Sequence, residues 1–359
     1  MGAALAKGYV ARIWAGLNSS PLRRNIGYTL VRQLFSAAAQ FLLVVVIARA
    51  LGPEGNGHYA MAVLLPSLLA QFLNLGVGPA TVYFVSRGDV AVRQAAAENG
   101  RLGLTVAGIG VAGGLVVLYA FRESLFPGVP TTFLLLGLAA FPASLLLAYF
   151  NTILQGLEDF RAFNWNTLVP PYVTLAGACM MLFLLGMGTE AAVKAYLIGQ
   201  AAGLTSVLLF LRDRLRRAAE QRDERAIEQY RRRVLGYGWK AHLSNVMAFL
   251  NYRADIFLVN LFLTPTATGV YVIAVQIAEK LWMLSQAAST VLLPRLSAMH
   301  ANPRGRLRLT NRGFHIVILL TAGLGGATAV ALYWLLVPVF GSEYRDAMDA
   351  FLCLLPGII

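Results

Sequence analysis

Long runs of apolar residues alternate with short polar segments along nearly the whole chain. Most of these runs reach the length of about 20 residues that a helix needs to cross the hydrocarbon core of a bilayer. Nine spans are predicted, namely 26–48, 58–86, 102–121, 131–155, 164–186, 191–211, 240–262, 268–293 and 313–336, and a tenth begins near residue 346. Lipid offers no hydrogen-bond partners to backbone amides, so these spans are expected to be α-helices.

One short motif occurs twice in the chain. The pattern P-x3-G-x-Y-x2-A-V covers residues 53–63 and returns at 265–275, an offset of 212 residues. Each copy lies between two long apolar runs, so each marks the same corner of a helical hairpin. A repeat unit of this length is typical of the duplicated helix bundles of membrane carriers. Coincidence in a chain rich in Gly, Ala and Val is the alternative.

Composition and charge support a membrane protein. The chain is 58% hydrophobic and 13% charged, which excludes an ordinary soluble domain. Of its 30 Lys and Arg residues, 23 fall before the first span or in the loops on that side of the membrane, and only 4 fall in the opposite loops. This asymmetry follows the positive-inside rule and predicts a cytoplasmic N-terminus. The net charge of +13 therefore reflects topology, and no nucleic-acid partner is expected.

The predicted fold class is an all-α polytopic membrane protein with two parallel six-helix lobes. Residues 1–25 form a cytoplasmic leader, either disordered or carrying a short interfacial helix. Residues 26–211 form the N-lobe, and 212–239 form a basic cytoplasmic linker, helical at least in part because of its i, i+4 ion pairs. Residues 240–359 form a C-lobe that is incomplete, so the chain is expected to lack two or more helices.

Enzymatic motifs are not found. The glycine pattern at 108–113 matches a dinucleotide fingerprint, but it lies inside an apolar span and indicates helix packing instead. The four histidines have no metal-ligand spacing, and Cys179 and Cys353 form no disulfide framework. No catalytic residue, metal or cofactor is therefore expected.

Charged residues inside the spans are the candidate functional groups. They are Arg32, Arg253, Asp255, Glu279 and Lys280. Ionisable groups at such depth are costly unless they are paired or face water, so they indicate a transport pathway. Mutual neutralisation is the alternative, with Arg253 pairing Glu279 or Asp255 pairing Lys280.

Several segments resemble one known family, the Wzx-type polysaccharide flippases. These segments are 47–59, 252–258, 268–274, 277–281, 291–297 and 340–344. The resemblance covers roughly the whole chain, and its one departure is the missing C-terminal end. The family belongs to the multidrug/oligosaccharidyl-lipid/polysaccharide exporter superfamily.

The resemblance implies a flippase that moves polyprenyl-diphosphate-linked oligosaccharide to the outer leaflet of the bacterial inner membrane, beside the enzymes of polysaccharide assembly. Alternating access of the two lobes would carry the substrate across. The substrate-binding candidates are Arg32, Asn251, Arg253, Gln276 and Lys280, and the coupling or gating candidates are Asp255 and Glu279. A drug/cation antiporter, a membrane-embedded polymerase or ligase of the same pathway, and a scaffold are the alternatives.

Overall fold

A computed structural model describes residues 21–217, 224–298 and 303–358. Most of the predicted leader, with its interfacial helix, lies outside the described residues. The helices are α2 (Pro21–Leu73), α3 (Val77–Ser86), α4 (Val92–Leu125), α5 (Thr131–Gly156), α6 (Phe160–Cys179), α7 (Thr189–Arg217), α8 (Glu224–Phe262), α9 (Pro265–Ala298), α10 (Pro303–Phe340) and α11 (Ala347–Ile358). A π-helical turn, Met180–Leu184, extends α6, and a 3-10 turn, Ser342–Tyr344, precedes α11.

Six of the described helices are long and apolar enough to cross a membrane by length and composition. The helices follow the predicted apolar runs closely, and the all-α polytopic fold class is confirmed. The structure differs from the predicted spans in two places. The first two spans join without a loop, because Gly52 alone leaves the helical conformation, with φ 68° and ψ −176°. The second span is interrupted at Leu75 and Gly76, both of which have positive φ.

Close approach of two backbones explains the second interruption. A Cβ atom on Gly76 would lie 2.0 Å from the carbonyl oxygen of Gly238 in α8. Glycine is therefore required at position 76 both for its left-handed φ of 68° and for space. The apolar pattern continues through this point, so hydrophobicity alone could not reveal the break.

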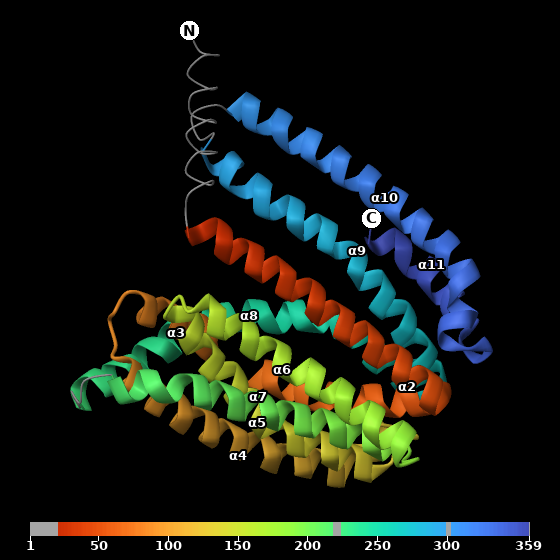
Figure 1. Ribbon diagram of the computed structural model, residues 1–359, viewed down its shortest axis with the longest axis horizontal. Helices are drawn as coiled ribbons and strands as arrows, with labels where there is room; N and C mark the ends of the chain where they lie inside the picture. Colours follow the sequence, from red (N-terminus) through yellow and green to blue (C-terminus); the bar gives the residue numbers. More distant parts are fainter. Residues whose placement is uncertain (1–20, 218–223, 299–302, 359) are drawn as a thin grey trace. The chain divides into compact units, whose positions relative to one another are not determined.

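The chain divides into two compact units. Unit 1 comprises Met1–Leu43, Ala62–Arg122 and Thr131–Arg253, and unit 2 comprises Val44–Met61, Glu123–Pro130 and Ala254–Ile359. In unit 1, the core includes Phe141 and Tyr149 of α5. In unit 2, helices α9, α10 and α11 lie side by side (Figure 1), and Ile273 and Phe351 are fully buried among them.

Part of the predicted linker is a docked helix in unit 1. Helix α8 begins at Glu224, and Tyr230 and Val234, one turn apart, are buried in the core with α3, α4 and α5. Arg231 lies 3.9 Å from the carboxylate of Glu98, whose side chain is buried. The same helix then continues to Phe262, so the linker runs directly into the seventh predicted span.

Candidate functional site

The two copies of the repeated motif meet in unit 2. A Cβ atom on Gly57 of α2 would lie 1.8 Å from the carbonyl oxygen of Pro265, and one on Gly269 of α9 would lie 1.8 Å from that of Pro53. Each glycine thus packs against the proline that opens the other copy. Such reciprocal contacts are what a two-fold relation between the copies requires, and they allow two helix backbones to touch.

Polar contacts surround this crossing. Asn56 donates a hydrogen bond from Nδ2 to the carbonyl oxygen of Gly269, at 2.8 Å. A ring nitrogen of His58 lies 3.0 Å from the carbonyl oxygen of Gly128, which belongs to the connection between α4 and α5. Asn260 of α8 reaches the same connection by donating to the carbonyl oxygen of Pro127 at 3.4 Å. The corner is therefore built from three separate stretches of the chain.

Two marker segments of the predicted family lie against each other in the same unit. Arg49 donates from Nε to the carbonyl oxygen of Val339, at 2.8 Å, and a second nitrogen reaches the carbonyl of Pro338. The Tyr344 hydroxyl donates to the carbonyl oxygen of Ala48 at 3.4 Å. Arg49 thereby satisfies carbonyls in the last turn of α10, where the helix dipole favours a cation.

Four of the seven candidate site residues belong to unit 2, and all four are half-buried: Asp255, Gln276, Glu279 and Lys280. The Tyr271 hydroxyl of the repeated motif donates to Asp255 Oδ2 at 2.8 Å. Within the described residues, Asp255 and Lys280 do not form an ion pair with each other. The carboxylate of Asp255 thus has a neutral donor as its partner.

The other three candidates, Arg32, Asn251 and Arg253, belong to unit 1. Arg32, half-buried in α2, donates from Nη1 to the hydroxyl oxygen of Thr167 in α6, at 3.4 Å. Arg253 is half-buried in α8, and Asn251 is exposed there. A shared cavity lined by Arg32, Arg253 and Lys280 stays a prediction.

Sequence reasoning missed the polar residues of α6 in unit 1, one of which, Thr167, contacts Arg32. Asn166 and Thr167 are neighbours in α6, and Asn166 donates to Asn151 Oδ1 of α5 at 2.9 Å. The run Phe-Asn-Trp-Asn-Thr at 163–167 places three polar side chains near the start of an otherwise apolar span. Uncharged polar residues at such positions were the overlooked signal.

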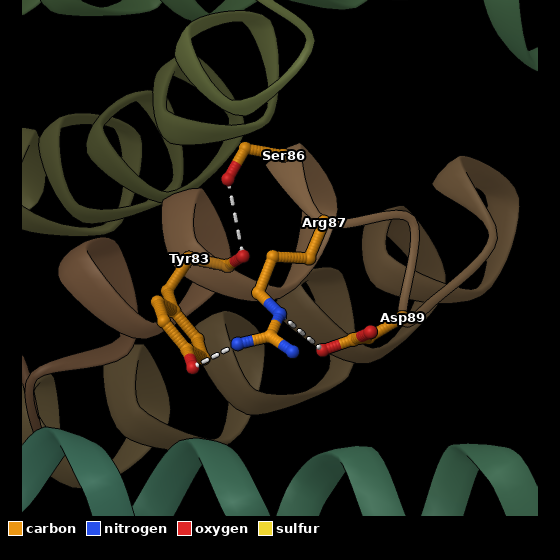
Figure 2. A network of polar contacts seen from close by, with 4 residues as sticks. All are labelled: Tyr83, Ser86, Arg87 and Asp89. Carbon is orange, nitrogen blue, oxygen red and sulfur yellow. Dashed lines mark hydrogen bonds and ion pairs between the residues drawn. The ribbon is translucent and has the colours of Figure 1, made fainter.

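An exposed arginine of a predicted cytoplasmic loop has local partners. Figure 2 shows Arg87 at the end of α3, donating to the Tyr83 hydroxyl at 2.5 Å and pairing with Asp89 at 3.3 Å. Its guanidinium also lies 5.1 Å from the centre of the Tyr83 ring. This cation therefore stabilises a turn between two helices. Among the described residues, no group of three or more His, Cys, Asp or Glu is placed to hold a metal.

Comparison with known families decides the identity of the chain. Residues 22–300 match the family described as "Polysaccharide biosynthesis protein". The chain belongs to this family. No protein of curated function matches it.

Solved structures show the same fold at low sequence identity. The lipid II flippase MurJ, in an inward closed conformation, superposes with a TM-score of 0.67 at 14% identity, over 92% of this chain and 72% of that one. An outward-facing multidrug resistance MATE transporter of the MOP superfamily gives 0.61 at 16%, over 95% and 80%. The eukaryotic MATE transporter AtDTX14 gives 0.60 at 12%, over 94% and 78%.

The chain is therefore a multi-pass membrane protein of the polysaccharide biosynthesis family, and its fold is that of the MOP-superfamily transporters.

Proposed function

We propose that this protein is a transporter that flips polyprenyl-diphosphate-linked oligosaccharide from the cytoplasmic to the outer leaflet of the bacterial inner membrane. The main support for this proposal is Arg32, which lies within a predicted span. Its guanidinium is half-buried and donates a hydrogen bond to a hydroxyl group. Among the described residues, no carboxylate lies within ion-pair distance of it. A cation without a carboxylate partner suits an anionic headgroup such as a diphosphate. The shared fold with a lipid II flippase supports the same class of cargo.

The repeated corner fits an alternating-access mechanism. With a cytoplasmic N-terminus, both copies of the motif lie at the outer side of the membrane. Backbone contact between Gly57 and Gly269 then closes this corner, and its separation opens a path outward. Cysteines placed at the linker, for example at Arg232, should resist a membrane-impermeant thiol reagent added outside intact cells. Labelling of this cysteine from outside would show that the orientation in the membrane is the reverse of the predicted one.

Flipping of a fluorescent polyprenyl-diphosphate-linked oligosaccharide in proteoliposomes tests the function. We expect Arg253→Ala to abolish it at normal protein levels, and Arg253→Lys to impair it, because an ammonium cannot make the paired hydrogen bonds of a guanidinium. If Arg253 only neutralises Glu279, exchanging the two residues should restore transport. Wild-type flipping by Arg253→Ala would refute the proposal.

A drug/cation antiporter is the second candidate, because multidrug MATE transporters share the fold. In that case Asp255 and Glu279 would bind the substrate. Uptake of a cationic dye into the same proteoliposomes, lost in Asp255→Asn and unaffected in Arg253→Ala, would favour this function over flipping.

A further inference from the structure

Two polar contacts of α6 form a polar cluster that links this helix to α2 and to α5 in unit 1. It comprises Arg32 of α2, Asn151 of α5, and Asn166 and Thr167 of α6. A second contact, from the Tyr172 hydroxyl to the carbonyl oxygen of Phe35 at 3.3 Å, holds α6 against α2 beyond the cluster. Helix α6 therefore contacts α2 through two hydrogen bonds and α5 through one.

Two groups of this cluster retain unused hydrogen-bonding capacity. Asn166 is 0% exposed and donates to Asn151, yet its own Oδ1 has no hydrogen-bond partner within the described part of the chain. Arg32 Nε is also buried without a partner there. A buried polar atom left unpaired costs free energy, so each such atom in a folded protein requires an explanation.

A second asparagine in the same unit shows that the fold can satisfy this side chain completely. Asn99 is also 0% exposed. Its Oδ1 accepts from Tyr230 at 3.3 Å, and its Nδ2 donates to Thr81 at 3.1 Å and to the Tyr149 carbonyl at 3.4 Å. Both polar atoms of the Asn99 side chain therefore have partners, whereas the Oδ1 of Asn166 has none among the described residues.

The two unpaired atoms indicate which chemical group each side chain can still bind. An N–H at Arg32 requires an acceptor, and an oxygen at Asn166 requires a donor. A hydroxyl group can donate to the amide oxygen of Asn166, and a hydroxyl oxygen can also accept from a guanidinium. Phosphate oxygens only accept when ionised, so a diphosphate alone would leave Asn166 Oδ1 unpaired.

We propose that Asn166, held by Asn151, binds a hydroxyl group of the sugar that is attached to the diphosphate. This inference rests on the proposed function and names the part of the cargo that the N-terminal helices recognise. It makes Asn166 a residue that distinguishes a glycosylated carrier lipid from a bare one.

Binding of two probes to the purified full chain in nanodiscs tests this proposal. The probes are polyprenyl diphosphate and the same lipid carrying one N-acetylglucosamine, with neutral polyprenol as the reference. We expect the wild type to bind the glycosylated probe about tenfold more tightly than the bare diphosphate, from hydrogen bonds to one hydroxyl. Asn166→Leu should reduce this ratio to about one and leave binding of the bare diphosphate unchanged.

Asn166→Ala also lacks the acceptor and gives the same readout if the leucine variant does not accumulate. Asn99→Leu is the matched control, expected to lower the melting temperature while keeping the ratio. Equal binding of the two diphosphate probes by the wild type would overturn the sugar site, as would a ratio that survives in Asn166→Leu. If Asn166→Leu binds both diphosphate probes more weakly by the same factor and also melts at a lower temperature, Asn166 has a structural role instead. If neither diphosphate binds more tightly than polyprenol, the proposed function itself fails.

Discussion

The two copies of the repeated motif share one backbone contact and differ in the side chains around it. A Cβ atom added to either Gly57 or Gly269 would lie 1.8 Å from a backbone carbonyl oxygen of the other copy. Their preceding residues, Asn56 and Thr268, occupy equivalent positions and are both buried. Asn56 bonds across the crossing to the Gly269 carbonyl, whereas Thr268 bonds within its own helix to the Thr264 carbonyl at 2.9 Å.

The aromatic residue of the second copy has its own polar partner. Tyr271 donates to the Asp255 carboxylate. The position 212 residues before Asp255 is Leu43, so the first copy has no acid there for Tyr59. The comparison teaches that the glycines fix a contact common to both copies, while polar chemistry has diverged around it. Substitutions of the glycines should therefore be costly in both copies, and substitutions of the polar residues should be unequal.

The largest effect is expected at the crossing itself. Gly57→Ala and Gly269→Ala each place a methyl group against a backbone carbonyl that cannot rotate away, so each should destabilise the folded protein by about 3 kcal/mol. Thermal unfolding in detergent measures the change.

Gly323→Ala in α10 is the control, because a Cβ atom there meets nothing within 4 Å. It should be neutral or stabilise the helix by up to about 1 kcal/mol. If all three variants unfold at similar temperatures, the close backbone contact at the crossing does not limit the stability of the protein. If only one of Gly57 and Gly269 is sensitive, the contact is not shared by the two copies.

The next effect is expected at the tyrosine that differs between the copies. Tyr271→Phe removes the hydroxyl donor of Asp255 and should cost about 2 kcal/mol, since a hydrogen bond to a carboxylate is stronger than one to a neutral acceptor. Tyr333→Phe, at an exposed position of α10, is the control and should be neutral. A Tyr271→Phe variant as stable as that control would show that Asp255 finds an equivalent partner when the hydroxyl is absent.

Apolar patterning predicted most of the helices but could not predict their interruptions. The runs around 102–121 and 131–155 lie within α4 and α5 because membrane helices need continuous hydrophobicity. The break at Leu75 and Gly76 depends on α8 packing nearby, and nothing local in the sequence encodes that neighbour.

The candidate site was predicted in the same uneven way. Charged residues inside spans are rare and therefore visible, as Arg32 and Asp255 were. Their partners, Thr167 and Tyr271, are residue types common in membrane helices, and only the fold shows which of them lie within reach. The repeated motif was recognisable because its spacing is preserved, yet the sequence did not show that the copies touch.

The smallest effects on stability are expected at Asn56 and Thr268. A difference in cost between these two substitutions tests whether polar contacts differ between the two copies of the motif. Asn56→Leu removes a buried hydrogen bond between two helices and should cost about 1 kcal/mol. Thr268→Val removes a hydroxyl that mainly bonds its own helix four residues back, a contact that adds little to helix stability, so the cost should be about half as large. The double variant should show additive changes in unfolding free energy, because the hydrogen bonds of Asn56 and Thr268 go to different partners. Strong coupling between them would mean that the glycine crossing transmits a shift from one copy of the motif to the other.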